Sequence, residues 1–252
     1  MANRLHAPSL GIGRKRRSRF AEAQAVRGFA RDGLPMVFQP VFELESSDRV
    51  AVEALARFPG RPSQPPMVWF DRAEQLGLLV ELELACVRSA LDCLGELPDD
   101  VRLSINVSPR TAITTELAEL VAPVGERVII ELTEHAPVED YELLKESIER
   151  LRQSGARIAV DDVGTGFANV PHVLRLAPDI VKLDRSLTRE METDSTSRAL
   201  TSALVTYCKR IGATVVAEGI ESQATLTLLR RLGVGQGQGY YLGCPGPLAG
   251  TP

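Results

Sequence analysis

The stretch MVFQPVFELESSDRVAVEALA, residues 36–56, contains two apolar segments joined by a short polar one. Residues 36–42 and 50–56 have the length and apolar character of β-strands. Only residues 43–49 connect them, whereas parallel neighbours in a sheet need a crossover of about a dozen residues or more. Ser46, Ser47 and Asp48 in this connection are typical turn formers. We therefore predict a β-hairpin, in which the first strand runs antiparallel to the second.

The rest of the chain alternates between strand-like and helical patterns. Further apolar, strand-like runs occur at residues 101–107, 128–132, 157–160, 180–183, 214–217 and, rich in glycine, 234–241. Helical patterns occur at residues 20–31, 69–94, 114–121, 141–155, 168–176, 195–211 and 223–232.

Most of the predicted strands are apolar nearly throughout, as parallel strands are when both of their faces are covered. Strand–helix alternation over a chain of 252 residues is typical of a closed barrel, which usually has about 250 residues. We therefore predict an α/β fold, a TIM-like (β/α)8 barrel with the first strand antiparallel to the others.

Composition and charge limit the class of protein. Hydrophobic residues make up 44% of the chain, and no apolar run approaches the roughly 18 residues of a membrane span, so we expect no transmembrane segment. Cys86, Cys93, Cys208 and Cys244 lack the spacing of a zinc site or a disulfide framework, which indicates reduced thiols and a cytoplasmic location. The net charge of −4 argues against duplex nucleic acid as a partner.

The N-terminus is an exception to this acidic balance. The segment Arg-Lys-Arg-Arg at residues 14–17, with Arg19, forms a basic cluster outside any hydrophobic period. Such a cluster can contact nucleic acid or acidic lipid, but a solvated tail is the simpler interpretation. We therefore expect a disordered basic tail at residues 1–18, followed by a single domain at residues 19–252.

Polar side chains recur at the carboxyl ends of the predicted strands, where barrels of this type carry their chemistry. In chain order these positions hold Glu53, Asn106, Glu131, Asp161 with Asp162, Lys182, Glu218 and Gln238. Since these strand ends meet at one rim, we expect the side chains to lie together. Two carboxylates about 4 Å apart repel by roughly 4 kcal/mol at an effective dielectric of about 20. A rim of this kind has to hold protons, separate its carboxylates or bind cations.

Taken singly, several of these residues have simpler interpretations. Glu53 could pair with Arg57 in a salt bridge. Asn106 could shape the loop after its strand. Asp161 and Asp162 could form a turn and cap the next helix. None of these interpretations explains why so many carboxylates occur at the carboxyl ends of successive predicted strands. We therefore favour a metal site.

The ligand chemistry favours a hard divalent cation. Carboxylates with one asparagine amide suit Mg²⁺ or Mn²⁺. Zinc is not expected, because His6, His135 and His172 do not fall at matching strand ends. Lys182 lies in a predicted strand, on the same side as Asp184. A buried ammonium costs several kcal/mol unless anionic groups meet it, so we expect Lys182 to point at the reaction centre.

The motifs, in this order, resemble those of the EAL domain family. The resemblance covers about residues 20–247 and includes the triplet that names the family. The matching segments are Gln39-Pro40, Glu53-Ala54-Leu55-Ala56-Arg57, Ala73-Glu74-Gln75-Leu76-Gly77-Leu78, Ser104-Ile105-Asn106-Val107-Ser108, Glu131-Leu132-Thr133-Glu134, Asp161-Asp162-Val163-Gly164-Thr165-Gly166, Val181-Lys182-Leu183-Asp184-Arg185, Ala217-Glu218-Gly219-Ile220-Glu221 and Gln238-Gly239-Tyr240.

The resemblance implies a metal-dependent phosphodiesterase that hydrolyses cyclic di-GMP, a bacterial second messenger, to linear pGpG with two Mg²⁺ or Mn²⁺ ions. The ligands it implies are Glu53, Asn106, Glu131 and Asp161 for the first ion, and Asp161, Asp162 and Glu218 for the second. The catalytic residues it implies are Glu53, Asp162, Lys182 and Glu218, and either Asp162 or Lys182 would assist proton movement. The substrate-binding residues would be Gln39, Leu55, Arg57 and Gln238, and the supporting residues Glu134, Asp184 and Glu221.

The chain departs from the family pattern in one loop. Val163 stands where the family usually has phenylalanine, and Ala168-Asn169 replaces a common serine pair. By resemblance, this loop couples a dimer interface to the metal site, and we expect a homodimer. None of the implied metal ligands is replaced, which favours an active enzyme.

Two alternatives for the rim remain open, beside a third and less favoured one, an interaction protein that works through the basic tail. One is a cyclic di-GMP receptor, non-catalytic or weakly active, that signals through protein partners. The other is an enzyme with a different preference, such as pGpG or another cyclic dinucleotide. No regulatory domain is visible in the sequence, so such a domain or a protein partner would lie outside this chain.

Overall fold

The computed structural model describes residues 10–60, 64–133, 140–164 and 175–248. Within these residues, strands β1 to β8 follow one another around a closed barrel. The strands are β1 Met36–Glu43, β2 Arg49–Ala56, β3 Arg102–Val107, β4 Val128–Leu132, β5 Arg157–Val163, β6 Ile180–Leu183, β7 Thr214–Ala217 and β8 Gln236–Gly237. The predicted strand-like runs and the barrel are therefore confirmed, and the glycine-rich last strand is shorter than its pattern indicated.

The hairpin at the start of the barrel is also confirmed. Strand β1 is antiparallel to β2 and to β8, whereas each neighbouring pair from β2 to β8 is parallel. The backbone N–H of Glu43 donates to the carbonyl of Asp48 at 2.9 Å, which closes the turn. Ser47 in this turn has a left-handed φ of 66°. A connection this short leaves no room for a crossover helix, so the first strand has to reverse direction.

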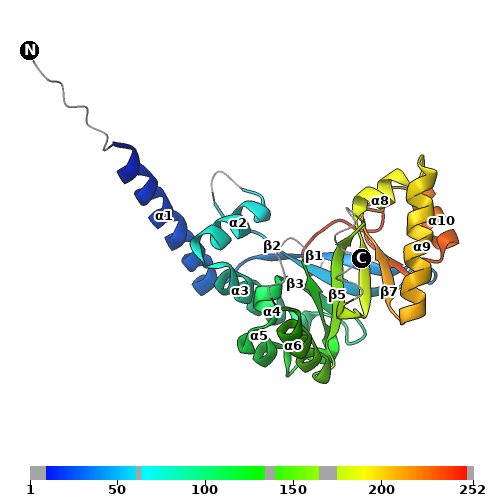
Figure 1. The fold of residues 1–252 in the computed structure, drawn as a ribbon, viewed down its shortest axis with the longest axis horizontal. Coiled ribbons are helices and arrows are strands. Elements are labelled where there is room, and N and C mark those ends of the chain that lie inside the picture. The colour runs from blue at the N-terminus through cyan, green and yellow to red at the C-terminus, as the bar shows by residue number, and fades with distance from the viewer. Residues whose placement is uncertain (1–9, 61–63, 134–139, 165–174, 249–252) are drawn as a thin grey trace, which may run out of the picture.

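Helices surround the strands (Figure 1). Apart from short 3₁₀ turns at Leu94–Glu96 and Gly125–Arg127, they are α1 Leu10–Asp32, α2 Pro66–Leu76, α3 Leu79–Asp92, α4 Pro109–Ala112, α5 Thr115–Val121, α6 Tyr141–Gln153, α8 Arg185–Glu190, α9 Ser195–Ile211 and α10 Gln223–Leu232. The helix predicted at residues 168–176 lies mostly outside the described residues. None of the described helices combines the length and the apolar character that a bilayer-spanning segment needs.

Helix α1 extends into the segment that the sequence predicted to be a disordered tail. Helix α1 begins at Leu10, whereas the sequence predicted disorder through residue 18. Arginine, lysine and alanine are good helix formers, and a helix that is packed at one end extends readily from it. The N-terminal part of α1 projects away from the barrel (Figure 1). Residues 1–9 of the predicted tail lie outside the described residues.

The predicted helix at residues 69–94 is two helices. Gly77 follows the last residue of α2 with φ 71° and ψ 26°, a left-handed conformation. The N–H of the next residue, Leu78, donates to the carbonyl of Ala73 at 2.7 Å, as in a glycine-terminated helix end. The apolar period continues through this break, so periodicity alone could not locate it.

Apolar packing on both sides of the sheet holds the barrel together. The main cluster lies between the strands and their helices, and includes Leu103, Ile130 and Val181 from the strands and Leu117, Leu144 and Ile148 from the helices. A separate small cluster comes from inward-facing strand positions, which are Val41, Ala51, Ile129, Ala159, Ile180 and Val216. This inner cluster is the apolar floor on which the polar rim of the barrel lies.

Candidate functional site

The candidate site lies directly above this apolar floor. Five residues of the site each come two positions after a residue of the floor. They are Glu53, Glu131, Asp161, Lys182 and Glu218. Side chains alternate between the faces of a strand, so residues two apart share a face. The same inward alternation that builds the floor therefore directs four carboxylates and one ammonium into the mouth of the barrel.

The strand register brings polar residues from different strands to one height. Glu53 on β2 lies opposite Ser104 on β3, two residues before Asn106. Asn106 in turn lies opposite Glu131 on β4, and Glu131 opposite Ala159 on β5. This stagger is the shear that closes a barrel of tilted strands. As a result, neighbouring strands deliver their polar side chains to a single ring.

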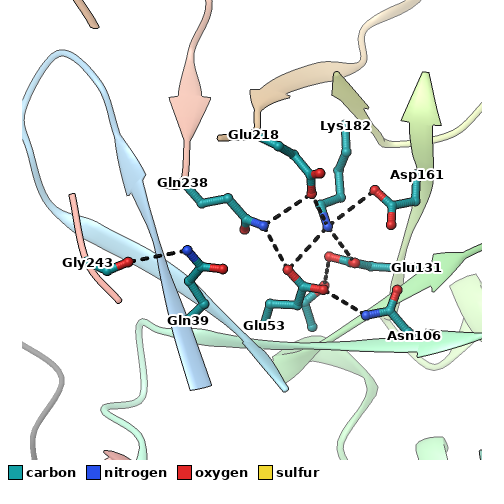
Figure 2. A network of polar contacts seen from close by, with 10 residues as sticks. Gln39, Glu53, Asn106, Glu131, Asp161, Lys182, Glu218, Gln238 and Gly243 are labelled. Carbon is teal, nitrogen blue, oxygen red and sulfur yellow. Dashed lines mark hydrogen bonds and ion pairs between the residues drawn. The ribbon is translucent and has the colours of Figure 1, made fainter. Parts of the chain in front are cut away.

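The ammonium group of Lys182 lies at the centre of this ring (Figure 2). Its side chain is 2% exposed, and Nζ lies 2.7 Å from a carboxylate oxygen of Glu131 and 2.7 Å from one of Glu218. It also lies 3.4 Å from a carboxylate oxygen of Glu53 and 3.4 Å from one of Asp161. Four carboxylates around one ammonium leave a net negative charge when all of them are ionised.

Burial and crowding change the pKa values of the ring. Burial and repulsion from neighbouring carboxylates raise the pKa of Glu131 to about 8 and that of Glu218 to about 8, although Lys182 lowers both. Burial also raises the pKa of Glu53, but Lys182 and hydrogen bonds from two amides outweigh this and hold it below its usual range. Burial lowers the pKa of Lys182, but the four carboxylates outweigh it and raise it well above its usual value. Without cations, the ring therefore retains protons that ordinary carboxylates have lost at neutral pH.

Two side-chain amides orient the carboxylates (Figure 2). Nδ2 of Asn106 donates to Glu53 at 2.8 Å, which leaves its carbonyl Oδ1 as a ligand atom. Nε2 of Gln238 donates to Glu53 at 2.8 Å and to Glu218 at 3.1 Å. The Oε1 atom of Gln238 is buried and has no hydrogen-bond partner among the described residues. Both amides therefore hold ring carboxylates through their NH₂ groups and keep an amide oxygen that accepts no hydrogen bond from these carboxylates.

The donor set fits a hard divalent cation. Oδ1 of Asp161 is buried and has no hydrogen-bond partner among the described residues, although Lys182 lies 3.4 Å away. Asp161, Asp162 and Glu218 each offer an oxygen atom, and these atoms lie within 4.8 Å of one another. The group contains only oxygen ligands, which suit small hard cations better than zinc or copper.

A β-bulge makes the pair of adjacent aspartates possible. The pairing of β5 with β6 shifts register between Val160 and Val163. Within this irregularity, Asp162 has a left-handed φ of 54°. In a regular strand two consecutive side chains point to opposite faces, whereas a bulge redirects one of them. Asp161 and Asp162 can therefore both serve the same cation-binding group.

A cavity of about 330 Å³ opens beside the ring. Leu55 and Arg57 line it from the end of β2, next to Asn106, and Phe70 of α2 forms part of its wall. The guanidinium Nη1 of Arg57 donates to the backbone carbonyl of Ala56 at 3.1 Å, so the end of this side chain folds back against the end of β2. Leu55 and Arg57, which the sequence predicted as substrate-binding residues, therefore line a cavity that Asp161 and Asp162 also line.

Two predicted residues lie outside the network of the ring. Gln39 is opposite Glu53 in the register of β1 with β2, but its Nε2 donates to the carbonyl of Gly243 at 3.3 Å. Asp184 was expected on the Lys182 side, yet its carboxylate caps helix α8 by accepting from the N–H of Ser186 at 2.7 Å. Its position directly before a helix start explains the difference, since aspartate is a preferred N-cap residue.

The loops around the ring contain the remaining predicted residues. Glu221 is exposed and pairs with Arg189 of α8, so it ties the loop after β7 to the helix after β6. Val163, the position where the family usually has phenylalanine, is 1% exposed and lies in the core. Glu134 and the Ala168-Asn169 pair lie outside the described residues.

The sequence interpretation missed two polar residues that contact the site or its supports. Ser104 donates through Oγ to Glu131 at 2.5 Å. It precedes Asn106 by two positions, so strand alternation could have identified it. Glu83 of α3 is 7% exposed and accepts hydrogen bonds from Ser108, which follows β3. Nothing in the sequence distinguishes Glu83, because glutamate is common in helices.

Comparison with known proteins gives consistent matches. The family model described as EAL domain matches residues 22–245. The probable cyclic di-GMP phosphodiesterase PdeA of Escherichia coli is 31% identical over 221 residues, which cover 84% of this chain and 30% of that protein. The curated relatives are longer proteins, and the chain spans only 29% to 38% of their length.

Solved structures match over most of the barrel. The structure of the PaMucR phosphodiesterase in complex with c-di-GMP has a TM-score of 0.78 and 25% identity, and the match covers 91% of this chain and 98% of that one. The BlrP1 protein of Klebsiella pneumoniae, in a complex with manganese and cy-diGMP, has a TM-score of 0.74 and 26% identity. That match covers 84% of this chain and 56% of the other.

Proposed function

The chain belongs to the EAL domain family, and we propose that it hydrolyses cyclic di-GMP to linear pGpG at the rim of its barrel, with two Mg²⁺ or Mn²⁺ ions. The observation that carries this proposal is the ring of four carboxylates around Lys182, of which Glu53 and Glu131 are buried and Asp161 and Glu218 are partly buried. Such a concentration of negative charge is costly unless cations share it. The relative named as a probable cyclic di-GMP phosphodiesterase, matched along most of this chain, supports the choice of substrate.

The residues of the ring divide between the two proposed ions. The ligands would be Glu53, Asn106, Glu131 and Asp161 for one ion, and Asp161, Asp162 and Glu218 for the other. When bound, the ions would lower the pKa of a water molecule and offset the charge that develops on the phosphate. The three residues whose oxygen atoms lie within 4.8 Å of one another support the second of these sites.

Side chains of the ring would orient the reactants. Lys182, held between Glu131 and Glu218, would donate a hydrogen bond to a phosphate oxygen. The buried Oε1 of Gln238 would accept a hydrogen bond from the attacking water. The carboxylate of Asp162 would accept a proton from that water.

The bond changes account for the product. The water oxygen would attack one phosphorus atom of cyclic di-GMP, and the bond from that phosphorus to the 3′-oxygen would break. The cyclic dinucleotide is then open at one of its two phosphodiester linkages. The departing 3′-oxygen takes a proton, and the phosphate stays on the 5′-oxygen, which gives linear pGpG. A purine base would pack in the cavity against Leu55 and Phe70, with Arg57 near the phosphate.

The test is a hydrolysis assay in which the products are separated by chromatography. We expect the wild-type chain with Mg²⁺ or Mn²⁺ to form pGpG, and Glu53→Ala to reduce turnover by at least about 100-fold. The matched control is Glu43→Ala. Glu43 is the last residue of β1 and accepts a hydrogen bond from the side chain of Gln236, which is not part of the ring. Binding without turnover in either metal would favour the receptor alternative. Turnover that survives Glu53→Ala would contradict the assigned site.

A further inference from the structure

Glu83 is a buried carboxylate outside the ring. It lies on α3, in the outer layer of helices, and is 7% exposed. The backbone N–H of Ser108 donates to its two oxygens at 3.2 and 3.1 Å, and the Ser108 hydroxyl donates at 2.7 Å. The hydroxyl of Thr111 donates to it as well. Three donor groups from one short turn therefore converge on a single side chain of a neighbouring helix.

The turn that Glu83 holds is the one that follows the metal-ligand position on β3. Ser108 is the N-cap of α4 and comes two residues after Asn106. Val107 lies between Asn106 and Ser108 and is fully buried. Packing of Val107 and the hydrogen bonds to Ser108 therefore both restrain the backbone at the end of β3. Since Asn106 donates to Glu53 at 2.8 Å, any shift of this backbone would move its Oδ1 relative to the ring.

Packing a helix against a barrel through a carboxylate is unfavourable in free energy. A buried charged group costs several kcal/mol unless hydrogen bonds compensate it, and an apolar side chain of similar size would avoid that cost. A carboxylate does, however, accept several hydrogen bonds without offering a donor of its own. Glu83 also lines the same cavity as Asn106 and Asp161. Both facts indicate that the geometry of this turn matters to the site.

We propose that Glu83 is a positioning residue that, through Ser108, holds Asn106 where its Oδ1 can bind the first cation, and that it thereby sets the affinity for that cation. The inference rests on the proposed function, because it requires the rim to bind divalent cations. Residues that hold metal ligands in place typically change metal affinity about 10- to 100-fold when they are altered.

The test is a titration of the metal-free protein with Mn²⁺. Electron paramagnetic resonance measures the concentration of free Mn²⁺ at each step and so gives the affinity of the site. Glu83→Gln keeps the size of the side chain but replaces an acceptor oxygen with a donor nitrogen. We expect it to weaken the tighter Mn²⁺ site about 10-fold or more. Ser108→Ala removes one donor to Glu83 and keeps the backbone N–H, so we expect a smaller effect in the same direction.

The matched control is Asp194→Asn. Asp194 accepts from the N–H groups of Thr196 and Ser197 at 3.0 and 2.8 Å at the start of α9. It is therefore also a carboxylate that holds a helix start, but one outside the network of the ring. We expect Asp194→Asn to lower thermal stability in the way that Glu83→Gln does and to leave Mn²⁺ affinity unchanged.

Three outcomes have distinct meanings. Weaker Mn²⁺ binding in Glu83→Gln, a smaller loss in Ser108→Ala and normal binding in Asp194→Asn support the positioning role. Lower stability with unchanged Mn²⁺ affinity in Glu83→Gln overturns it and leaves Glu83 as an anchor between α3 and α4. If the wild-type chain binds no Mn²⁺, the proposed function fails and this inference fails with it.

Discussion

Lys182 is the residue on which charge balance at the rim depends when no cation is bound. Its ammonium contacts four carboxylates, so Lys182→Met would leave them with no positive partner. We expect this change to destabilise the metal-free protein by about 3–5 kcal/mol, the usual effect of removing one partner of a buried ion pair. Urea unfolding in the presence of a chelator measures it.

Lys145→Met is the control for the removal of a lysine. Lys145 pairs with Glu142 on the surface of α6, and both side chains are well exposed. Exposed pairs of this kind contribute little, so we expect a change within about 0.5 kcal/mol. Equal urea midpoints for Lys182→Met and the wild type would show that the ring is not charged as described.

Glu131 and Glu218 give the metal-free protein a characteristic pH dependence. Their pKa values of about 8 exceed the ordinary carboxyl value of 4.5. Between these two values the folded state holds protons that the unfolded state has released. The contribution of these groups to stability is therefore complete below about pH 4.5 and declines as the pH rises toward 8.

A divalent cation should replace those protons. We expect Mn²⁺ binding at pH 7 to release roughly one proton or more, and fewer near pH 9, where the carboxylates are already ionised. Titration calorimetry in buffers with different ionisation enthalpies measures the number. An observed heat that does not depend on the buffer would contradict the raised pKa values.

Among the elements, the bulge of β5 stores backbone strain at the site. Asp162 has a φ of 54°, a region that glycine adopts freely and other residues adopt at a cost of about 1–2 kcal/mol. Asp162→Gly and Asp162→Ala both remove the carboxylate, so the two variants differ mainly in how easily their backbone adopts a positive φ. We expect the glycine variant to be about 1 kcal/mol more stable than the alanine variant.

The same pair of substitutions at Asp161 is the control. Asp161 lies in β5 without a positive φ, so alanine should be the more stable replacement there, by roughly 0.5–1 kcal/mol. Urea unfolding of the four metal-free variants gives both differences. The same order of stability at both positions would show that Asp162 is not strained.

Helix α1 is attached to the barrel through aromatic contacts. The ring of Phe29 lies 5.3 Å from that of Phe58 and 5.0 Å from that of Trp69, both in edge-to-face geometry. We expect Phe29→Ala to destabilise the protein by about 2–4 kcal/mol, somewhat less than for a fully buried phenylalanine. Phe20, on the same helix, is 66% exposed, so Phe20→Ala should change stability by less than about 0.5 kcal/mol. Similar losses for the two variants in urea unfolding would contradict this attachment.

The elements that the sequence predicted well are those with strong local constraints. The seven-residue connection in the first hairpin and the continuous apolar runs of the strands left few alternatives. The break at Gly77 and the start of α1 at Leu10 could not be predicted, because they depend on one glycine's conformation and on helix propagation beyond a packed segment. Short helices such as α4 and α8 have too few residues to show a helical period.

At the scale of the whole molecule, the barrel explains both the success and the limits of the site prediction. Strand ends meet at one rim, so residues such as Glu53 and Glu218, far apart in the sequence, could be placed together from their positions alone. Side-chain contacts across layers leave no such pattern. The contact between Glu83 and Ser108 joins a helix to a turn, and nothing in either segment indicates it. The expected homodimer remains a prediction.

The most direct test of a metal-dependent rim is anomalous scattering from crystals grown with Mn²⁺. We predict two anomalous peaks at the mouth of the barrel. One would lie among Glu53, Asn106, Glu131 and Asp161, and the other among Asp161, Asp162 and Glu218. A map without a peak at the rim, in which Lys182 still holds the four carboxylates as the only cation, would contradict the account.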